Sequence, residues 1–194
     1  MIQKKNISAI ILSGGKSSRM GTDKALLQLE GKTFLERIVD VVTPLVCNVV
    51  VIGDQAELEA YNLQHFPDLI PNSGPMAGIF TGLFYSESEY NLILSCDIPM
   101  INVAVIQELM ASSNLDASVN QLKSDEQTLP LVAIYKKTCM HSCLEALKKG
   151  ERRLQNWVAQ LETNTIPLDP KWEPYIRNIN TPAQWDALKN EIEH

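Results

Sequence analysis

A glycine-rich segment near the start of the chain, residues 12–24, gathers the groups that a polyphosphate ligand needs. Its glycines let the backbone approach a ligand closely and turn N–H groups toward it. Its cations are Lys16, Arg19 and Lys24, in a chain whose net charge at pH 7 is −6. Backbone donors and fixed cations together suit the oxygens and the charge of a triphosphate. A solvated surface turn explains each residue taken singly, but it explains the whole segment less well.

The spacing within this segment differs from that of two common phosphate-binding motifs. A P-loop needs Gly-x-x-x-x-Gly-Lys-Ser/Thr, whereas Gly15 and Gly21 are separated by five residues and followed by Thr-Asp-Lys. The Gly-x-Gly-x-x-Gly order of dinucleotide-binding folds is missing as well. The sequence therefore disfavours an ATPase of the P-loop type and a dehydrogenase.

A single carboxylate, Asp97, follows the apolar residues 91–95 almost directly. Such an apolar run is typical of a buried parallel strand, and ligands of parallel sheets bind beyond the carboxyl ends of the strands. Mg²⁺ prefers oxygen ligands and is often held by one or two carboxylates together with substrate phosphates. Asp97 is therefore a candidate Mg²⁺ ligand. Taken without other information, it fits an Asx turn or a helix cap equally well.

The elements that must position these groups alternate between strands and helices. Strands are predicted at residues 7–12, 49–52, 91–95, 117–121 and 131–135. Helices are predicted after a Thr33 cap, at 55–61, from Pro75, at 103–110, 136–149 and 152–161, and after Thr181. Repeated strand-then-helix order predicts an α/β layered domain with a largely parallel sheet. Three polar groups, namely residues 13–24, Asp54 and Asp97, would then follow strand ends and converge.

Composition limits the class of protein. With 194 residues, 45% of them hydrophobic and 21% charged, the chain can bury a sizeable core and form one ordinary domain. The acidic net charge argues against general binding of nucleic acid. No membrane span or signal peptide is predicted, so we expect a cytoplasmic protein with reduced thiols. Cys139 and Cys143 have helical spacing, which a partly buried helix explains better than a zinc site.

Residues 12–27, Leu-Ser-Gly-Gly-Lys-Ser-Ser-Arg-Met-Gly-Thr-Asp-Lys-Ala-Leu-Leu, closely resemble the signature of the molybdenum cofactor guanylyltransferases, or MobA proteins. These proteins belong to the wider nucleotidyltransferase superfamily. Later segments are similar to the family in the same order: Gly-Pro-Met-Ala-Gly-Ile at 74–79, Cys-Asp-Ile-Pro at 96–99, Gly-Glu-Arg-Arg at 150–153 and Asn-Ile-Asn-Thr-Pro at 178–182. The resemblance therefore covers nearly the whole chain.

The resemblance implies a three-layer, Rossmann-like α/β nucleotidyltransferase fold with a mostly parallel central sheet, formed by residues 1–194 as a single domain. It implies that the N-terminal half binds GTP and the C-terminal half binds molybdopterin. The implied reaction transfers GMP from GTP to molybdenum-bound molybdopterin, with Mg²⁺ as cofactor and pyrophosphate as the second product. The attacking phosphate monoester has a second pKa of about 6, so it is mostly ionised at pH 7 and needs no general base.

On the same resemblance, Lys24 and Arg19 would contact the phosphates of GTP, with Arg19 beside the leaving pyrophosphate, and Asp97 would hold Mg²⁺. The further GTP contacts would be Leu12, Ser13, Gly14, Gly15, Asp68 and Gly78. Ser13 stands where the family more often has alanine. A surface turn is the alternative explanation for Asp68, and close helix packing is the alternative for Gly78.

The resemblance assigns molybdopterin to Asn178, Asn180 and Arg152. The two asparagines alternate along the sequence and would face one side of a strand. A structural turn before the Thr181 cap is the alternative for the asparagines. An exposed arginine at the start of a helix is the alternative for Arg152.

Two other functions stay open at this stage. One is a cytidylyltransferase or a sugar-phosphate nucleotidyltransferase of the same fold, because the sequence does not display the backbone contacts that select the base. The other is a non-catalytic nucleotide-binding module, against which the presence of both Lys24 and Asp97 argues. The expected partners are GTP and molybdopterin as small-molecule substrates, without nucleic acid or membrane. Transient contacts with proteins of molybdenum cofactor biosynthesis, or with molybdoenzyme chaperones, are also expected.

Overall fold

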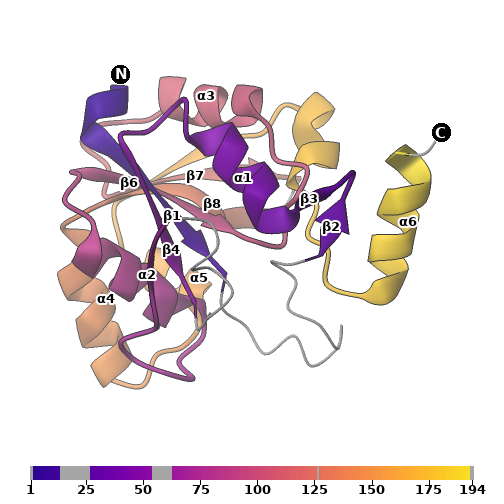
Figure 1. Cartoon of the computed structure of the whole chain (residues 1–194). Helices are drawn as coiled ribbons and strands as arrows, with labels where there is room; N and C mark the ends of the chain where they lie inside the picture. Colours follow the sequence, from indigo (N-terminus) through magenta and orange to yellow (C-terminus); the bar gives the residue numbers. More distant parts are fainter. Residues whose placement is uncertain (1, 14–26, 54–62, 126, 193–194) are drawn as a thin grey trace.

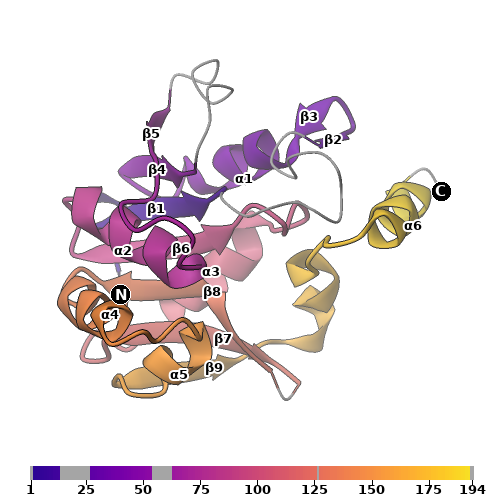
Figure 2. The ribbon, with the colours of Figure 1, turned by 90° about the horizontal axis from the view of Figure 1, so that it is seen from below.

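The computed structural model describes residues 2–13, 27–53, 63–125 and 127–192. Within these ranges, one seven-stranded sheet has the order β5-β4-β1-β6-β8-β7-β9, which Figure 2 shows from one edge to the other. Its strands are β1 Ile7–Leu12, β4 Asn48–Ile52, β5 Gln64–Phe66, β6 Tyr90–Ser95, β7 Val119–Ser124, β8 Gln127–Lys136 and β9 Thr163–Pro167. Only the two pairs that include β8 are antiparallel, so the predicted mostly parallel sheet is confirmed.

Helices cover both faces of this sheet (Figure 1). One face carries α1 Phe34–Val42 and α3 Val103–Ala111, and the other carries α2 Pro75–Tyr85, α4 Cys139–Lys148 and α5 Leu154–Val158. Strand β1 shows why: Ile11 packs in the core with Leu35 of α1, whereas Ile10 packs in the core with Met76 of α2. All six residues of β1 are buried, which explains its unbroken apolar sequence. The predicted three-layer α/β fold is therefore confirmed.

A hairpin and a capped helix follow the glycine-rich segment. Strands β2 Gln28–Leu29 and β3 Lys32–Thr33 pair across Glu30 and Gly31, whose φ angles of 52° and 78° suit the tight turn between two antiparallel strands. Helix α1 then begins with the predicted capping box. The Glu36 backbone N–H donates to Thr33 Oγ1 at 3.2 Å, and the Thr33 N–H donates to a Glu36 carboxylate oxygen at 2.6 Å.

The last helix, α6 Pro182–Ile192, lies beside the β2–β3 hairpin and away from the central sheet (Figure 1). Its start follows the prediction, because the Gln184 N–H donates to Thr181 Oγ1 at 3.3 Å. Trp185 packs edge-on against Phe34, with ring centroids 5.2 Å apart. Leu188 is buried in the same small cluster, so α6 is held mainly by the residues that follow the glycine-rich segment.

Several boundaries differ from the sequence-based prediction. Residues 178–180 do not form the predicted strand, because they follow the 3₁₀ helix Pro170–Ile176 and leave the sheet on the way to α6. The short strands β5 and β9 were not predicted. In β9 only Ile166 is buried, so its sequence lacks the apolar pattern of a strand. The predicted helix at 55–61 lies outside the described residues.

None of the helices within the described part of the chain combines the length and the apolar character that a membrane span requires.

Helix α2 packs unusually close to β1 at Gly82. A methyl group at this position would lie 2.3 Å from Cγ2 of Ile10, a side chain that is fully buried. At Gly78, one turn earlier, the nearest atom would be Cδ2 of Leu12 at 3.0 Å. The sequence signal for this approach is the pair of glycines four residues apart on one helix.

We expect Gly82→Ala to destabilise the protein. Alanine would raise the helix propensity by about 1 kcal/mol, but overpacking a buried contact costs about 1–3 kcal/mol, and a 2.3 Å approach belongs at the upper end of that range. Urea unfolding should therefore show a net loss, with a smaller loss for Gly78→Ala because the Leu12 methyl group can rotate away. A Gly82→Ala protein at least as stable as the wild type would contradict this packing.

The buried face of α4 carries Cys139 and Cys143. Their thiols donate to the carbonyl oxygens of Ser118 at 3.3 Å and Met76 at 3.4 Å. Burial raises the pKa of Cys139 to about 11 and that of Cys143 to about 12. Zinc requires thiolates, and among the described residues no group of three or more His, Cys, Asp or Glu side chains could hold a metal ion. The helical spacing of these cysteines is therefore explained by packing.

Iodoacetamide at pH 8 should modify the exposed Cys47 and leave Cys139 and Cys143 unmodified until the protein is unfolded. Both buried thiols have pKa values above the ordinary value of 9.0. Their contribution to stability is therefore complete below about pH 9 and is lost as the pH rises toward 11 and 12. Mass spectrometry of native and urea-unfolded samples checks the labelling. Equal labelling rates for Cys143 and Cys47 at pH 8 would contradict the burial of the Cys143 thiol.

Candidate active site

The carboxyl ends of β1, β4 and β6 lie next to one another and are joined by backbone hydrogen bonds. The Ser13 N–H donates to the carbonyl of Ile52 at 2.8 Å, and the Cys96 N–H donates to the carbonyl of Leu12 at 3.0 Å. Ser13 therefore leaves β1 between two neighbouring strands, and Asp97 leaves the strand beside it. The strand order changes direction at this point, which is where parallel α/β sheets bind ligands.

Three predicted GTP contacts meet on the α2 side of this edge. A Cβ atom added to Gly78 would lie 3.0 Å from Leu12 Cδ2 and 3.6 Å from Asp68 Oδ1. The loop that carries Asp68 is fastened to α2, because the Leu69 N–H donates to the hydroxyl of Thr81 at 3.0 Å. The absence of a side chain at Gly78 thus lets helix, strand and Asp68 come together. Close packing and a role beside a ligand are compatible at this position.

Four predicted site residues cannot be placed. Gly14, Gly15, Arg19 and Lys24 lie outside the described residues.

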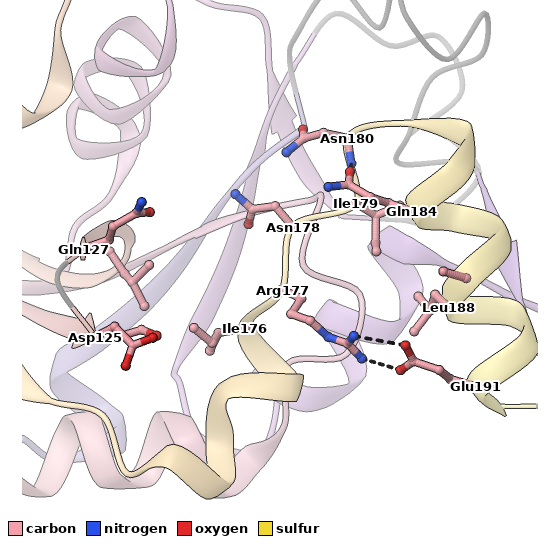
Figure 3. Close-up of a pocket in the computed structure, with 13 residues that line it drawn as sticks. Asp125, Gln127, Ile176, Arg177, Asn178, Ile179, Asn180, Gln184, Leu188 and Glu191 are labelled. Carbon is pink, nitrogen blue, oxygen red and sulfur yellow. Dashed lines mark hydrogen bonds and ion pairs between the residues drawn. The ribbon is translucent and has the colours of Figure 1, made fainter.

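On the other side of Asp97 lies the segment that carries both predicted asparagines. The N–H of Ile179 donates to the backbone carbonyl of Asp97 at 2.8 Å. Ile179 is buried against the cluster that holds α6. Asn178 and Asn180 flank this anchored residue, and both line a groove of about 700 Å³ (Figure 3). The structure therefore brings the two asparagines to the Asp97 turn, although not as a strand.

This groove lies between the β7–β8 hairpin, residues 176–180 and helix α6. Its lining residues are Ser124, Asp125, Gln127, Leu129, Ile176, Arg177, Asn178, Ile179, Asn180, Gln184, Ala187, Leu188 and Glu191. Arg177 and Glu191 form a two-pronged ion pair across it, with N–O distances of 3.1 and 2.5 Å (Figure 3). This hydrogen-bonded pairing raises the pKa of Arg177 and lowers the pKa of Glu191.

The preceding 3₁₀ helix is fixed to the body of the protein at two points. The indole N–H of Trp172 donates to Glu108 on α3 at 2.6 Å, and the hydroxyl of Ser124 on β7 donates to Glu173 at 2.7 Å. Downstream, the side-chain oxygen of Gln184 accepts from the Asn180 N–H at 2.7 Å. Residues 177–180 are therefore held at both ends.

Arg152 is not among the residues that line this groove. Its Nη1 donates to the carbonyl oxygens of Leu147 and Glu151, both at 2.8 Å, at the end of α4. Its own carbonyl lies 4.0 Å from the position of a Cβ atom on Gly74, just before α2. These contacts give Arg152 a structural role at the end of α4, and its predicted contact with molybdopterin stays a prediction.

Arg37 was not identified from the sequence. Its Nε donates to the carbonyl of Pro99 and its Nη1 to the carbonyl of Leu29, each at 3.3 Å, and it also pairs with Glu30. It thereby ties the turn after Asp97 to the β2–β3 hairpin. The sequence offered no signal for Arg37, because its low side-chain exposure of 22% appears only in the structure.

The Asp97 carboxylate fits the ligand preference of Mg²⁺. Asp97 offers a half-buried carboxylate at the end of β6. Among the described residues there is no cluster of three metal-binding side chains. Mg²⁺ commonly keeps several waters and completes its coordination with substrate phosphates, so one carboxylate fits its requirements.

Comparisons with known proteins agree with this arrangement. Residues 9–165 match the family described as the MobA-like NTP transferase domain. A probable molybdenum cofactor guanylyltransferase of Clostridium perfringens is 38% identical, over 99% of this chain and 100% of that protein. One from Flavobacterium johnsoniae is 32% identical, over 95% of this chain and 97% of that protein.

Among solved structures, molybdopterin-guanine dinucleotide biosynthesis protein A from Archaeoglobus fulgidus aligns with a TM-score of 0.80 and 21% identity, over 96% of this chain and 98% of that one. At this identity the likeness supports the fold alone. The family match begins within β1 and runs past Asp97 into β9, so it includes the ends of β1, β4 and β6 described above. The chain therefore belongs to the MobA-like NTP transferase domain family and is a nucleotidyltransferase.

Proposed function

We propose that this enzyme transfers GMP from GTP to molybdenum-bound molybdopterin and releases pyrophosphate in a Mg²⁺-dependent reaction. The observation that carries the proposal is the placement of two candidate binding regions on either side of Asp97. Leu12, Asp68 and Gly78 meet on one side, and the groove of Asn178 and Asn180 lies on the other. Relatives named as molybdenum cofactor guanylyltransferases support the choice of guanine and of the acceptor.

The proposed chemistry is one substitution at phosphorus. An oxygen of the acceptor's phosphate attacks the α-phosphorus of GTP and forms a new P–O bond. The bond between that phosphorus and the α–β bridging oxygen breaks, and its electron pair leaves with pyrophosphate. Because the attacking phosphate is mostly ionised at pH 7, no side chain has to remove a proton. The protein has to align the two phosphates and offset their repulsion.

In this proposal the N-terminal half of the chain supplies the GTP contacts. Gly14 and Gly15 would offer backbone groups, because the Leu12 carbonyl and the Ser13 N–H are already hydrogen-bonded between strands. Leu12, Ser13, Asp68 and Gly78 would border the nucleotide. The C-terminal half would supply the acceptor contacts through Asn178, Asn180 and Arg152.

Three residues are proposed to offset the negative charge of the phosphates, either directly or by holding Mg²⁺. Lys24 and Arg19 would offset the charge of the triphosphate and of the leaving pyrophosphate. Asp97 would hold Mg²⁺, which, when bound, supplies further positive charge to the phosphate oxygens. Asp97 follows β6, and Ser13 follows the neighbouring strand β1; this placement supports the proposed position of the Asp97 carboxylate beside the nucleotide.

Pyrophosphate release with different substrates tests the function. We expect release only when GTP, Mg²⁺ and molybdopterin are all present. Release with CTP in place of GTP would indicate a cytidylyltransferase, and release with a sugar phosphate as acceptor would indicate another branch of the superfamily. No release with any nucleotide and acceptor would reject enzymatic transfer of this kind.

Two substitutions test the assigned roles. Lys24→Ala and Asp97→Ala should each lower the rate of pyrophosphate release by a factor of at least about 100–1,000, because each removes charge stabilisation at the reacting phosphates. Circular dichroism and thermal unfolding should stay close to those of the wild type.

The matched controls are Lys32→Ala and Asp40→Ala. These two residues form an exposed ion pair at 2.6 Å that has no assigned role in the reaction, and such pairs contribute about 0–1 kcal/mol. Both controls should retain activity. A Lys24→Ala or Asp97→Ala enzyme that is as active as its control would remove that residue from the proposed mechanism.

A further inference from the structure

We propose that the groove between the β7–β8 hairpin and α6 holds the pterin ring of the acceptor, and that the Asp125 carboxylate binds the ring's 2-amino and N3–H groups. This inference rests on the proposed function and deepens it. It adds a specificity-determining residue from a part of the chain that the sequence motifs do not include.

The first support is position. In the strand order, Asp97 follows β6, with β1 on one side and β8 and β7 on the other. The cluster of Leu12, Asp68 and Gly78 belongs to the β1 side, and the groove belongs to the β8–β7 side. The hydrogen bond from Ile179 to the Asp97 carbonyl joins the groove directly to the turn between them. A ligand in the groove can therefore reach the Asp97 turn without displacing the nucleotide.

The second support is the shape and apolar character of the groove. Its volume of about 700 Å³ lies within the range of small-molecule sites. Leu129 is partly buried and lines the groove together with the edges of the more deeply buried Ile176, Ile179 and Leu188. A flat, fused ring can bury its faces against such side chains while its polar edge stays available for hydrogen bonds.

The third support is charge. Among the described residues that line the groove, the ionisable side chains are Asp125, Arg177 and Glu191. Arg177 and Glu191 are paired with each other, so their charges offset. The carboxylate of Asp125 therefore makes the net charge of the groove's described lining negative. A carboxylate disfavours any phosphate placed directly beside it. It suits instead an uncharged ring that presents N–H donors.

The fourth support is the match of hydrogen-bonding groups. The pterin edge presents two neighbouring donors, the 2-amino group and N3–H, and a carboxylate can accept both with its two oxygens. In Figure 3 the Asp125 carboxylate points into the groove from the hairpin, and Asn178 lies between it and Asn180. The ring would thus lie toward Asp125, and the phosphate end of the acceptor toward Asn180 and the Asp97 turn.

Guanine carries the same pair of donors, so the same chemistry could come from GTP. The placement of the other nucleotide contacts on the opposite side of Asp97 favours the pterin. The two sources predict different kinetics, because loss of the Asp125 carboxylate would raise the KM of only the substrate that it binds.

Three variants test the inference. Asp125→Asn replaces one acceptor oxygen by a donor and should raise the KM and the Kd for molybdopterin about 10- to 100-fold. Ala187→Trp fills the groove from an exposed position on α6 and should have the same effect. Asp186→Asn removes an exposed carboxylate of α6 that is not in the groove and should change neither value.

Pyrophosphate release measures KM and kcat for both substrates, and anaerobic calorimetry measures binding of molybdopterin to the nucleotide-free protein. The inference predicts that the KM and the Kd for molybdopterin rise in both groove variants, while the KM for GTP stays within about twofold of wild type. Unchanged molybdopterin values in both variants would overturn it, and so would a raised KM for GTP alone.

Calorimetry also separates this inference from the proposed function. If the wild type binds molybdopterin but releases no pyrophosphate from GTP, the proposed function fails. The difference in Kd between the wild type and the groove variants then still decides where the pterin binds. If the wild type binds no molybdopterin, the inference itself fails.

Discussion

The parallel pairing of β1 with both β4 and β6 is the constraint on which the site depends. Backbone hydrogen bonds continue to the last residue of β1 and one step beyond it, through the Leu12 carbonyl and the Ser13 N–H. The chain therefore leaves the sheet at a fixed point and in a fixed direction. Asp97 leaves the neighbouring strand under the same restraint. Preorganised charges and dipoles act on phosphates without first having to reorient, and a fully paired strand end provides such preorganisation.

The other half of the site is built by a different means. Beyond β6 the sheet contains the reversed strand β8, and the chain then crosses from β9 through a 3₁₀ helix to α6. This path has little regular pairing of its own. It is positioned by single contacts, such as those of Trp172 with Glu108 and Ile179 with the Asp97 carbonyl. A rigid sheet edge thus borders the proposed nucleotide site, and a segment fastened at a few points forms one wall of the groove.

The sequence was informative where the signal was local. The apolar run of β1, the capping box at Thr33 and the proline that starts α2 each lie within a few residues, and all three were confirmed. The prediction of a strand at 178–180 was wrong. Alternation over three residues cannot distinguish a strand from an extended segment that lies outside the sheet. The groove could not be predicted, since it depends on a contact between Ile179 and Asp97, which are distant in sequence. The roles of Lys24 and Arg19 stay predictions.

The small apolar cluster formed by Leu29, Phe34, Ile179 and Leu188 has a consequence for cooperativity. Leu27, the first described residue after the glycine-rich segment, packs against this cluster, and α6 supplies its opposite side. One body of packed side chains therefore joins the residues that follow the glycine-rich segment, which is proposed to bind GTP, to the wall of the proposed acceptor groove. If the first ligand tightens this cluster, the second meets a wall that is already ordered, and thermodynamic reciprocity requires each ligand to strengthen the other by the same factor.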